Sequence, residues 1–271
     1  MFLLHAIDAG ILGIVEGVTE FLPISSTGHL IIVNHWIHFG GNFTESFDVV
    51  IQLGAILSVI VYFWKRLIPT KSEKVVSNQG SFISLWSKII VAIIPAIILG
   101  LLFGNIIEHY LFNPIVVAIM LIIGGIILIF IEGKKRVVKI STLKELTLPK
   151  AFAIGCIQCF AMIPGTSRSA STIIGGMILG GSREVAAEFS FFLAIPTMVL
   201  ASGYTLMKHG EKFSHSQIAL LVIGFIVSFI VALVVIKEFM SFIQKNDFKG
   251  FGYYRIGLGI IILVLFGLHI L

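Results

Sequence analysis

The sequence predicts an all-α polytopic membrane protein built from six transmembrane helices and two re-entrant helical hairpins. The 271-residue chain is 57% hydrophobic and 12% charged, with a mean hydropathy of +1.05. Soluble domains carry about 25% charged residues, so this composition excludes an ordinary soluble protein. Six apolar stretches are long enough to cross about 30 Å of hydrocarbon, and two further apolar regions are interrupted by proline and hydroxyl residues.

The six long stretches are expected to be α-helices, because an open sheet in lipid would leave backbone groups unpaired. We place them near 47–65, 86–105, 112–132, 186–207, 216–236 and 254–271. Pro95 and Pro196 fall inside two of them and are expected to kink those helices.

The two interrupted regions are predicted to be hairpins that enter and leave by the same face. Residues 3–38 are broken at Pro23–Gly28, and residues 149–181 are broken at Pro164–Ser169. Most of their legs run to about 11 to 17 residues, which is shorter than the roughly 20 that span a bilayer.

The two hairpins resemble each other, which predicts an inverted-topology repeat. A shift of 141 residues places Pro23 on Pro164, Ser25 on Thr166, Ser26 on Ser167, Thr27 on Arg168 and Gly28 on Ser169. Repeat one covers about 1–132 and repeat two about 149–271, within a single integral membrane domain of residues 1–271. Each repeat holds one hairpin and three spans, and an odd number of crossings turns the second repeat upside down. Functional sites in such folds lie where the broken helices meet.

The lysines and arginines predict the orientation. Of these 19 residues, only Lys208 and Lys212 fall on one face of this arrangement, while Arg168 lies within a hairpin. The rest gather on the opposite face, which the positive-inside rule makes cytoplasmic, so that both termini lie outside. The formal net charge of +5 is explained by basic loops facing anionic lipid, and no nucleic-acid partner is expected.

Arg168 is expected to be the only lysine or arginine that cannot reach a flanking polar loop. A buried arginine in a membrane costs at least roughly 2.5–3.5 kcal/mol, so it normally binds something. Thr166, Ser167 and Ser169 surround it in the sequence, which favours an oxyanion such as a phosphate.

Ser25, Ser26 and Thr27 follow a proline at the start of the second leg of the first hairpin. Such residues cap helices, and capping alone explains them adequately. A helix start also directs free N–H groups and a positive dipole at the hairpin tip. Since the second hairpin repeats the arrangement, two converging tips would form a phosphate-binding pocket with Arg168 at its side.

Glu16 and Glu20 are four residues apart and therefore share one face of a helix. Two carboxylates in apolar surroundings are tolerated if they share a proton, bind a divalent cation or face a water-filled cavity. The alternative is that this face of the helix points toward water or lipid headgroups. His29 follows Ser26 by one turn and could act as a general acid/base or nucleophile, or could make a structural hydrogen bond. Gln52 could line the cavity.

The chain resembles the bacterial undecaprenyl-diphosphate phosphatases, the bacitracin-resistance family, along essentially its whole length. Two long motifs carry the resemblance: Glu16-Gly-x-Thr-Glu20-Phe-Leu-Pro-x-Ser-Ser-Thr-Gly-His29 and Pro164-Gly-Thr-Ser-Arg168-Ser. The segment from Phe47 to Ala55 is also similar to the family's next helix. One departure is Ala170, where the family usually has glycine.

The resemblance implies hydrolysis of C55 isoprenyl diphosphate to the monophosphate, which recycles the lipid carrier of cell-wall synthesis. It implies a divalent cation, Mg²⁺ or Ca²⁺, a bacterial cytoplasmic membrane, a site opening toward the outer face, and bacitracin that competes by binding the substrate. The oligomeric state stays open, with a homodimer among the alternatives. The positions that match the family's functional residues are Glu16, Glu20, Ser26, His29 and Arg168. Which group attacks phosphorus, a side chain or water, is left open.

A transporter or flippase for lipid phosphates is the main alternative, because inverted repeats with broken helices are typical of carriers. The group of two glutamates, a histidine and an arginine favours an enzyme, since a carrier could bind phosphate with arginine and helix ends alone. A channel finds little support, because the sequence has no repeated pore motif.

Overall fold

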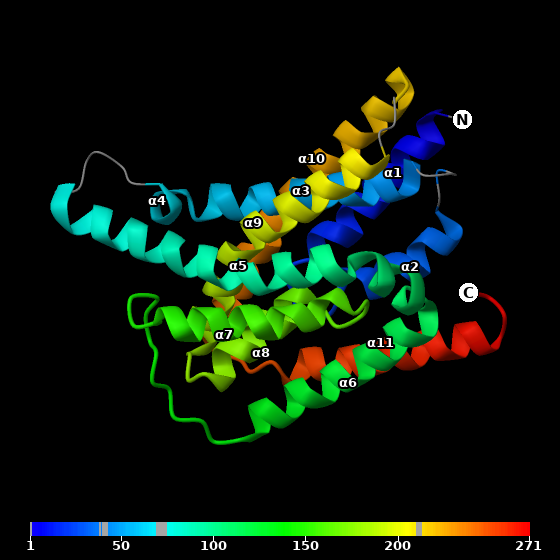
Figure 1. The fold of residues 1–271 in the computed structure, drawn as a ribbon. Helices are drawn as coiled ribbons and strands as arrows, with labels where there is room; N and C mark the ends of the chain where they lie inside the picture. Colours follow the sequence, from blue (N-terminus) through cyan, green and yellow to red (C-terminus); the bar gives the residue numbers. More distant parts are fainter. Residues whose placement is uncertain (1, 38, 40–42, 69–74, 210–212) are drawn as a thin grey trace.

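The computed structural model describes residues 2–37, 39, 43–68, 75–209 and 213–271, and within these ranges the chain is helical without strands (Figure 1). The helices of the first half are α1 (Phe2–Thr19), α2 (Ser26–Trp36), α3 (Phe43–Tyr62), α4 (Trp64–Leu67), α5 (Val75–Leu111) and α6 (Pro114–Gly133). The second half holds α7 (Leu148–Gln158), the 3-10 turn η1 (Cys159–Met162), α8 (Arg168–Ile178), α9 (Arg183–His209), α10 (His215–Phe242) and α11 (Lys249–Gly267). The predicted all-α class is confirmed.

Among the described residues, seven helices rather than six are long and apolar enough to cross a membrane. Six of them, α3, α5, α6, α9, α10 and α11, correspond to the six predicted spans. The seventh is α1, the first leg of the predicted hairpin 3–38, whose last residue lies outside the described part of the chain. Its 18 residues carry only two acidic groups, Asp8 and Glu16, so the apolar run is longer than expected for a hairpin leg.

The interrupted regions each form two helices that double back. In Figure 1, α1 runs from the N-terminus toward the middle of the molecule and α2 returns to the side from which α1 came. From the opposite side, α7 runs inward, and α8 returns after a turn at Pro164–Ser167. The two turns, which we call the first tip (Glu20–Ser25) and the second tip (Ile163–Ser167), therefore both end near the centre.

The two returning helices begin with the same local geometry. Ser25, the N-cap of α2, has φ 73° and accepts a hydrogen bond from the N–H of Gly28. Ser167, the N-cap of α8, has φ 71° and accepts from the N–H of Ala170. These caps are 142 residues apart, so the shift of 141 that aligned the prolines is wrong by one at the caps. The second tip has one more residue between its proline and its cap, and Arg168 therefore corresponds to Ser26.

Close helix contacts at glycine hold the tips in place. In α1, a Cβ at Gly13 would lie 2.7 Å from the carbonyl oxygen of Gly224 in α10. In α7, a Cβ at Gly155 would lie 2.0 Å from the carbonyl oxygen of Ala92 in α5. The backbones approach this closely because glycine lacks a side chain, a recurring device in membrane helices. Further contacts join α3 to α9 and α6 to α11.

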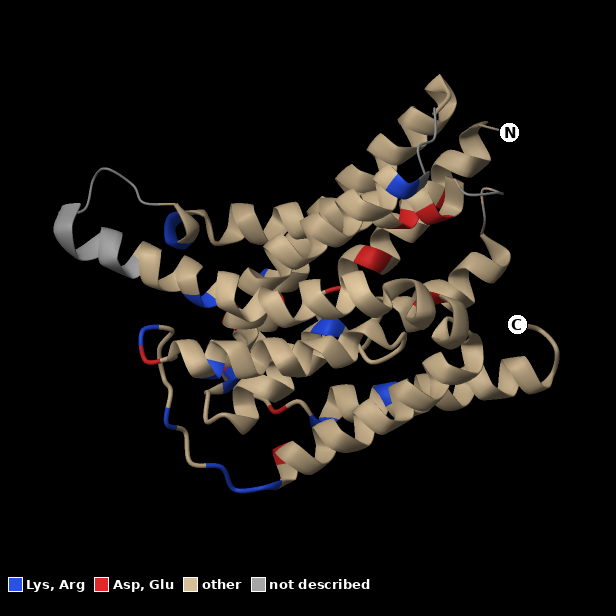
Figure 2. Ribbon diagram, in the orientation of Figure 1, with Lys and Arg blue, Asp and Glu red and all other residues tan. Residues whose placement is uncertain are grey.

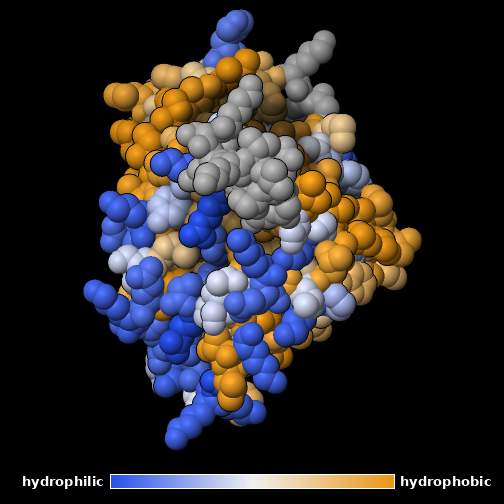
Figure 3. All heavy atoms as spheres, turned by 90° about the vertical axis from the view of Figure 1, so that its left-hand side faces the viewer, coloured by the Kyte–Doolittle hydropathy of each residue, from blue (hydrophilic) through white to orange (hydrophobic). Residues whose placement is uncertain are grey.

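Charged residues are distributed unevenly (Figure 2). Lysines and arginines gather at the end of the molecule opposite to both termini, and Figure 3 shows this end face-on with hydrophilic side chains over much of it. Lys212 lies outside the described residues. Arg255 contradicts the expectation that Arg168 alone is buried, because Arg255 is 0% exposed and lies within α11.

Candidate functional site

A cavity of about 300 Å³ lies where the two tips meet. Its polar walls come from both tips and the neighbouring spans: Glu20, Ser25, Ser26, Thr27, Gln52, Gln158, Ser167, Arg168 and Thr197. The remaining lining is small or apolar, with Ala96, Ala161, Met162, Gly165, Met198 and Ala201. Gln52 lines the cavity as the sequence suggested. The cavity thus combines a polar end with an apolar wall formed by α5, η1 and α9.

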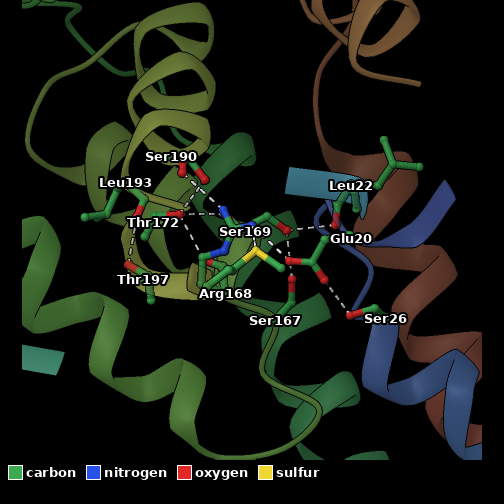
Figure 4. A network of polar contacts seen from close by, with 12 residues as sticks. Glu20, Leu22, Ser26, Ser167, Arg168, Ser169, Thr172, Ser190, Leu193 and Thr197 are labelled. Atoms are coloured by element: carbon green, nitrogen blue, oxygen red, sulfur yellow. Dashed lines mark hydrogen bonds and ion pairs between the residues drawn. The ribbon is translucent and has the colours of Figure 1, made fainter. Parts of the chain in front are cut away.

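Arg168 is the first residue of α8 and joins the two halves of the chain (Figure 4). Its Nη2 atom donates to Oε1 of Glu20 at 2.9 Å, and its Nη1 atom donates to the backbone oxygen of Ser190 at 3.1 Å. Both side chains of the ion pair are largely desolvated, with exposures of 11% for Arg168 and 8% for Glu20. The Nε atom of Arg168 is buried without a hydrogen-bond partner among the described residues. One donor therefore remains free for a ligand.

Glu20 connects the arginine to a hydroxyl group. Its second carboxylate oxygen, Oε2, accepts a hydrogen bond of 2.8 Å from Oγ of Ser26, the first residue of α2. The order hydroxyl, carboxylate, guanidinium is the arrangement in which a base can take a proton from a hydroxyl while a third group fixes the base. The sequence predicted these three residues, and the structure brings them together.

The hydroxyl groups of the second tip have separate tasks. Ser167 Oγ caps α8 and lies 3.0 Å from Ser169 Oγ. Ser169 Oγ also donates to the backbone oxygen of Leu22 at 2.8 Å, which ties the two tips together (Figure 4). Thr166 Oγ1 is buried and lacks a hydrogen-bond partner among the described residues, but Thr166 does not line the cavity.

The helix starts add positive potential to the cavity. Both α2 and α8 begin at its edge, and each has 11 residues, so their first N–H groups and dipoles face this region. Ser25 and Thr27 line the cavity from the first tip. Arg168 and two helix N-termini together give this end of the cavity a positive potential.

Glu16 lies one turn before Glu20 but is not among the residues that line the cavity. It is fully buried, and neither of its carboxylate oxygens has a hydrogen-bond partner among the described residues. Its charged neighbours are Glu20, Asp48 and Arg168. Carboxylates are the ligands that Mg²⁺ and Ca²⁺ prefer, and Mg²⁺ is often held by one or two of them together with substrate phosphates. No group of three or more potential ligand side chains occurs in the described chain, so Glu16 and Glu20 fit a cation only with help from a bound phosphate.

His29 is oriented by two hydrogen bonds outside the cavity. Its Nδ1 lies 2.7 Å from the backbone oxygen of Ser25, which requires Nδ1 to carry the proton. Its Nε2 lies 2.7 Å from the hydroxyl of Tyr254 in α11, and the two rings stack at 5.6 Å. In this arrangement both nitrogens are occupied, and a role in proton transfer or attack stays a prediction.

Several residues of the site were missed by sequence reasoning. Ser190 and Met198, both in α9, accept hydrogen bonds from Arg168, and Tyr254 was not singled out. Arg255 was placed on the basic face because it lies near the start of an apolar stretch. Gly124 and Gly125 on α6, which lie against the Arg255 side chain, are the signal that could have revealed its burial, since they leave space for a large side chain.

A second cavity of about 620 Å³ lies at the basic end of the molecule. Lys65, Arg66, Lys88 and Lys144 line it together with Glu184 and Glu188. Two of these four cations have partners: Arg66 pairs with Glu188, and Lys88 donates to the backbone oxygen of Leu143. The smaller cavity is the better candidate, because the two helix starts and the buried Arg168–Glu20 pair meet there.

The fold and the site together define a multi-pass helical membrane protein with an internal polar cavity, where a buried arginine–glutamate pair lies beside a hydroxyl group. Residues 9–261 match the bacitracin resistance protein BacA family. The chain is 50% identical to undecaprenyl-diphosphatase 1 of Clostridioides difficile (strain 630), over 97% of both chains. It is 48% identical to undecaprenyl-diphosphatase of Enterococcus faecalis over 94% of both, and 45% identical to that of Pseudomonas savastanoi pv. phaseolicola over 97% of this chain and 94% of the relative. The chain therefore belongs to the bacitracin resistance protein BacA family.

Proposed function

We propose that this chain hydrolyses undecaprenyl diphosphate to undecaprenyl phosphate and inorganic phosphate. The relatives named for that activity match this chain over nearly their full length. The observation that carries the proposal is the chain of contacts from Arg168 through Glu20 to Ser26, which joins two helix starts inside one cavity. A phosphoanhydride needs such a site, because charge builds on its oxygens in the transition state.

Binding of the diphosphate falls to the arginine and the two tips. The Nε atom of Arg168 has no partner among the described residues and would donate to the diphosphate, as would the N–H groups at the starts of α2 and α8. Ser25, Ser26, Thr27 and Ser167 line the same cavity, whereas Thr166 and Ser169 lie behind its wall. The apolar side of the cavity, with Met162 and Met198, offers a place for the first part of the prenyl chain.

Proton transfer falls to Glu20, whose carboxylate is 2.8 Å from Ser26 Oγ. In one route, Ser26 Oγ attacks the terminal phosphorus, gives its proton to Glu20 and releases undecaprenyl phosphate, and water then hydrolyses the phosphoserine. In the other route, Ser26 and Glu20 orient a water molecule that attacks directly. Recovery of an acid-stable phosphoserine at Ser26 after rapid quenching would select the first route.

A divalent cation, Mg²⁺ or Ca²⁺, is also proposed. The unpaired carboxylate oxygens of Glu16 and the neighbouring Glu20 would hold it together with the substrate. When bound, such an ion withdraws charge from phosphoryl oxygens.

We further propose that the chain is an inverted repeat with two re-entrant hairpins. Helix contacts support a two-fold relation: α1 packs on α10 as α7 packs on α5, while α3 meets α9 and α6 meets α11. Gly13 and Gly155, which make the equivalent close contacts, are 142 residues apart, as are the caps Ser25 and Ser167.

The proposed location is the bacterial cytoplasmic membrane, with both termini and the site opening outside. The basic end in Figure 2 would face the cytoplasm by the positive-inside rule. Labelling of intact cells tests this with Ser216→Cys and Ser141→Cys, two exposed positions at opposite ends, in a background where the free Cys156 and Cys159 are serine. We expect an impermeant maleimide to react at position 216 only; reaction at 141 alone would reverse the orientation.

The direct test is phosphate release by the purified protein in detergent. We expect turnover of undecaprenyl diphosphate, its loss in EDTA, and protection of the substrate by bacitracin, which sequesters it. Intact substrate with the wild-type protein would refute hydrolysis, and movement of lipid phosphate across vesicles without hydrolysis would favour the flippase alternative.

A further inference from the structure

We propose that Arg255 is a positioning residue that holds the two tips in register for catalysis. Arg255 is not among the residues that line the cavity, and its hydrogen bonds go to backbone oxygens other than those of Arg168 and Glu20. The proposal rests on the proposed function, because it assigns to Arg255 the geometry on which phosphate release depends.

The guanidinium of Arg255 contacts both tips at once. Nη1 donates to the backbone oxygen of Pro23 in the first tip at 3.2 Å. Nη2 donates to the backbone oxygens of Gly165 at 3.1 Å and Thr166 at 2.9 Å in the second tip. Pro23 precedes the cap of α2 by two residues, and Thr166 directly precedes the cap of α8. One side chain therefore sets the distance between the two segments that carry the anion site.

The surroundings of Arg255 are shaped to hold a guanidinium in α6. Nε and Nη2 also donate to the backbone oxygens of Leu121 at 3.4 Å and Met120 at 3.3 Å. A Cβ at Gly124 would lie 2.2 Å from Nη2, so glycine at this position leaves the space that the head group fills.

Arg255 has only carbonyl partners, and none of the described ion pairs includes it. A buried charge without a counter-ion is costly, so a purely packing role would be better served by an apolar side chain. The fork of five N–H donors suits arginine for joining separate carbonyls, whereas the donors of lysine radiate from one atom.

Three variants test the proposal: Arg255→Lys, Arg255→Met and Gly124→Ala. Misplacement of reacting groups by about 1 Å costs about 10²-fold in rate, so we expect kcat per folded molecule to fall by about that factor in Arg255→Lys. We expect KM to rise by a smaller factor than kcat falls, because the tips bind the diphosphate, whereas the apolar contacts of the prenyl chain also contribute to KM. Gly124→Ala should lower kcat about ten-fold while keeping the arginine, since its Cβ displaces the guanidinium. Gly133→Ala, on the same helix with no atom within 4 Å of the added Cβ, is the matched control.

Two measurements separate positioning from general destabilisation. In an Arg255→Met background, Gly124→Ala should have no further effect on kcat, because the displaced group is gone. Hydrogen exchange should become at least ten-fold faster at the backbone amides of 20–28 and 163–170 in Arg255→Lys, while exchange in α10 stays unchanged.

The outcomes distinguish the two proposals. Failure of the wild-type protein to release phosphate overturns the proposed function, whereas unchanged exchange at both tips overturns the role of Arg255 whatever the activity. Wild-type kcat in Arg255→Lys, or equal effects of Gly124→Ala and Gly133→Ala, also overturns it. Should Arg255→Lys fail to fold, Gly124→Ala decides by the same two measurements.

Discussion

The replacement Arg168→Lys tests whether the guanidinium, rather than its charge alone, supports the reaction. In the protein, Nη2 of Arg168 reaches Glu20 at 2.9 Å, Nη1 reaches the oxygen of Ser190 at 3.1 Å, and Nε stays free. A lysine ammonium keeps the charge but is a single point, so it cannot hold these two partners in place and also present a third donor to a phosphate.

The size of the effect follows from the contact that is lost. A hydrogen bond to a charged group contributes about 1.5–3 kcal/mol, which corresponds to about a 10- to 200-fold loss in kcat/KM for Arg168→Lys. Arg168→Ala leaves Glu20 as an unpaired buried carboxylate, which costs about 3–5 kcal/mol, or about 10² to 10⁴-fold if the same stabilisation is used in the transition state.

Initial rates of phosphate release from undecaprenyl diphosphate in detergent measure both variants, with thermal unfolding followed in parallel to count folded protein. Arg66→Lys is the matched control, because Arg66 also pairs with a glutamate, Glu188, but its side chain is 63% exposed and remote from the tips. Arg168→Lys at the wild-type rate, or a loss no larger than that of Arg66→Lys, would refute the reasoning.

Three further predictions concern the same region. Ser26→Ala should lower kcat by about 10²- to 10³-fold. Ser25→Ala removes the helix cap, so it should lower the free energy of unfolding by about 1 kcal/mol and lower kcat by less than ten-fold. Equal rates in the two variants would contradict the assignment of Ser26. Glu16→Gln should raise the Mg²⁺ concentration for half-maximal activity about ten-fold or more, and an unchanged titration would remove Glu16 from the cation site. Gly165→Ala should lower the unfolding temperature by the equivalent of about 1–3 kcal/mol, because φ is +88° and the added Cβ would lie 2.4 Å from a backbone oxygen of α6. Gly104→Ala, which meets nothing within 4 Å, should not lower it.

Much of the site could be predicted because charge is so scarce in this chain. Glu20 and Arg168 stand in apolar segments, and pairing stabilises desolvated charges of opposite sign, as it does for these two. Hydroxyl residues after a proline predicted helix starts, and Ser25 and Ser167 are both N-caps. These inferences needed only the local sequence.

Other features could not be predicted because they depend on packing between distant segments. Arg255 was assigned to the basic face, but its Nη1 donates to Pro23, 232 residues away. His29 was considered for proton transfer, and the structure places its ring against Tyr254, 225 residues away. The residue pattern around Arg255 and around His29 does not indicate that these side chains contact Pro23 and Tyr254.

The amino-acid sequence by itself determined that the chain is helical and has several apolar segments long enough to cross a membrane, because lipid forces backbone pairing within each segment. It also determined that charged and hydroxyl residues gather at two helix breaks, where each embedded charge is expensive. The tertiary structure alone decided which groups meet: the one-residue offset between the tips, the buried guanidinium from α11 and the hydrogen bonds that occupy both nitrogens of the histidine. These depend on how closely the helix backbones approach, which is set by contacts such as those of Gly13 and Gly155 with distant helices.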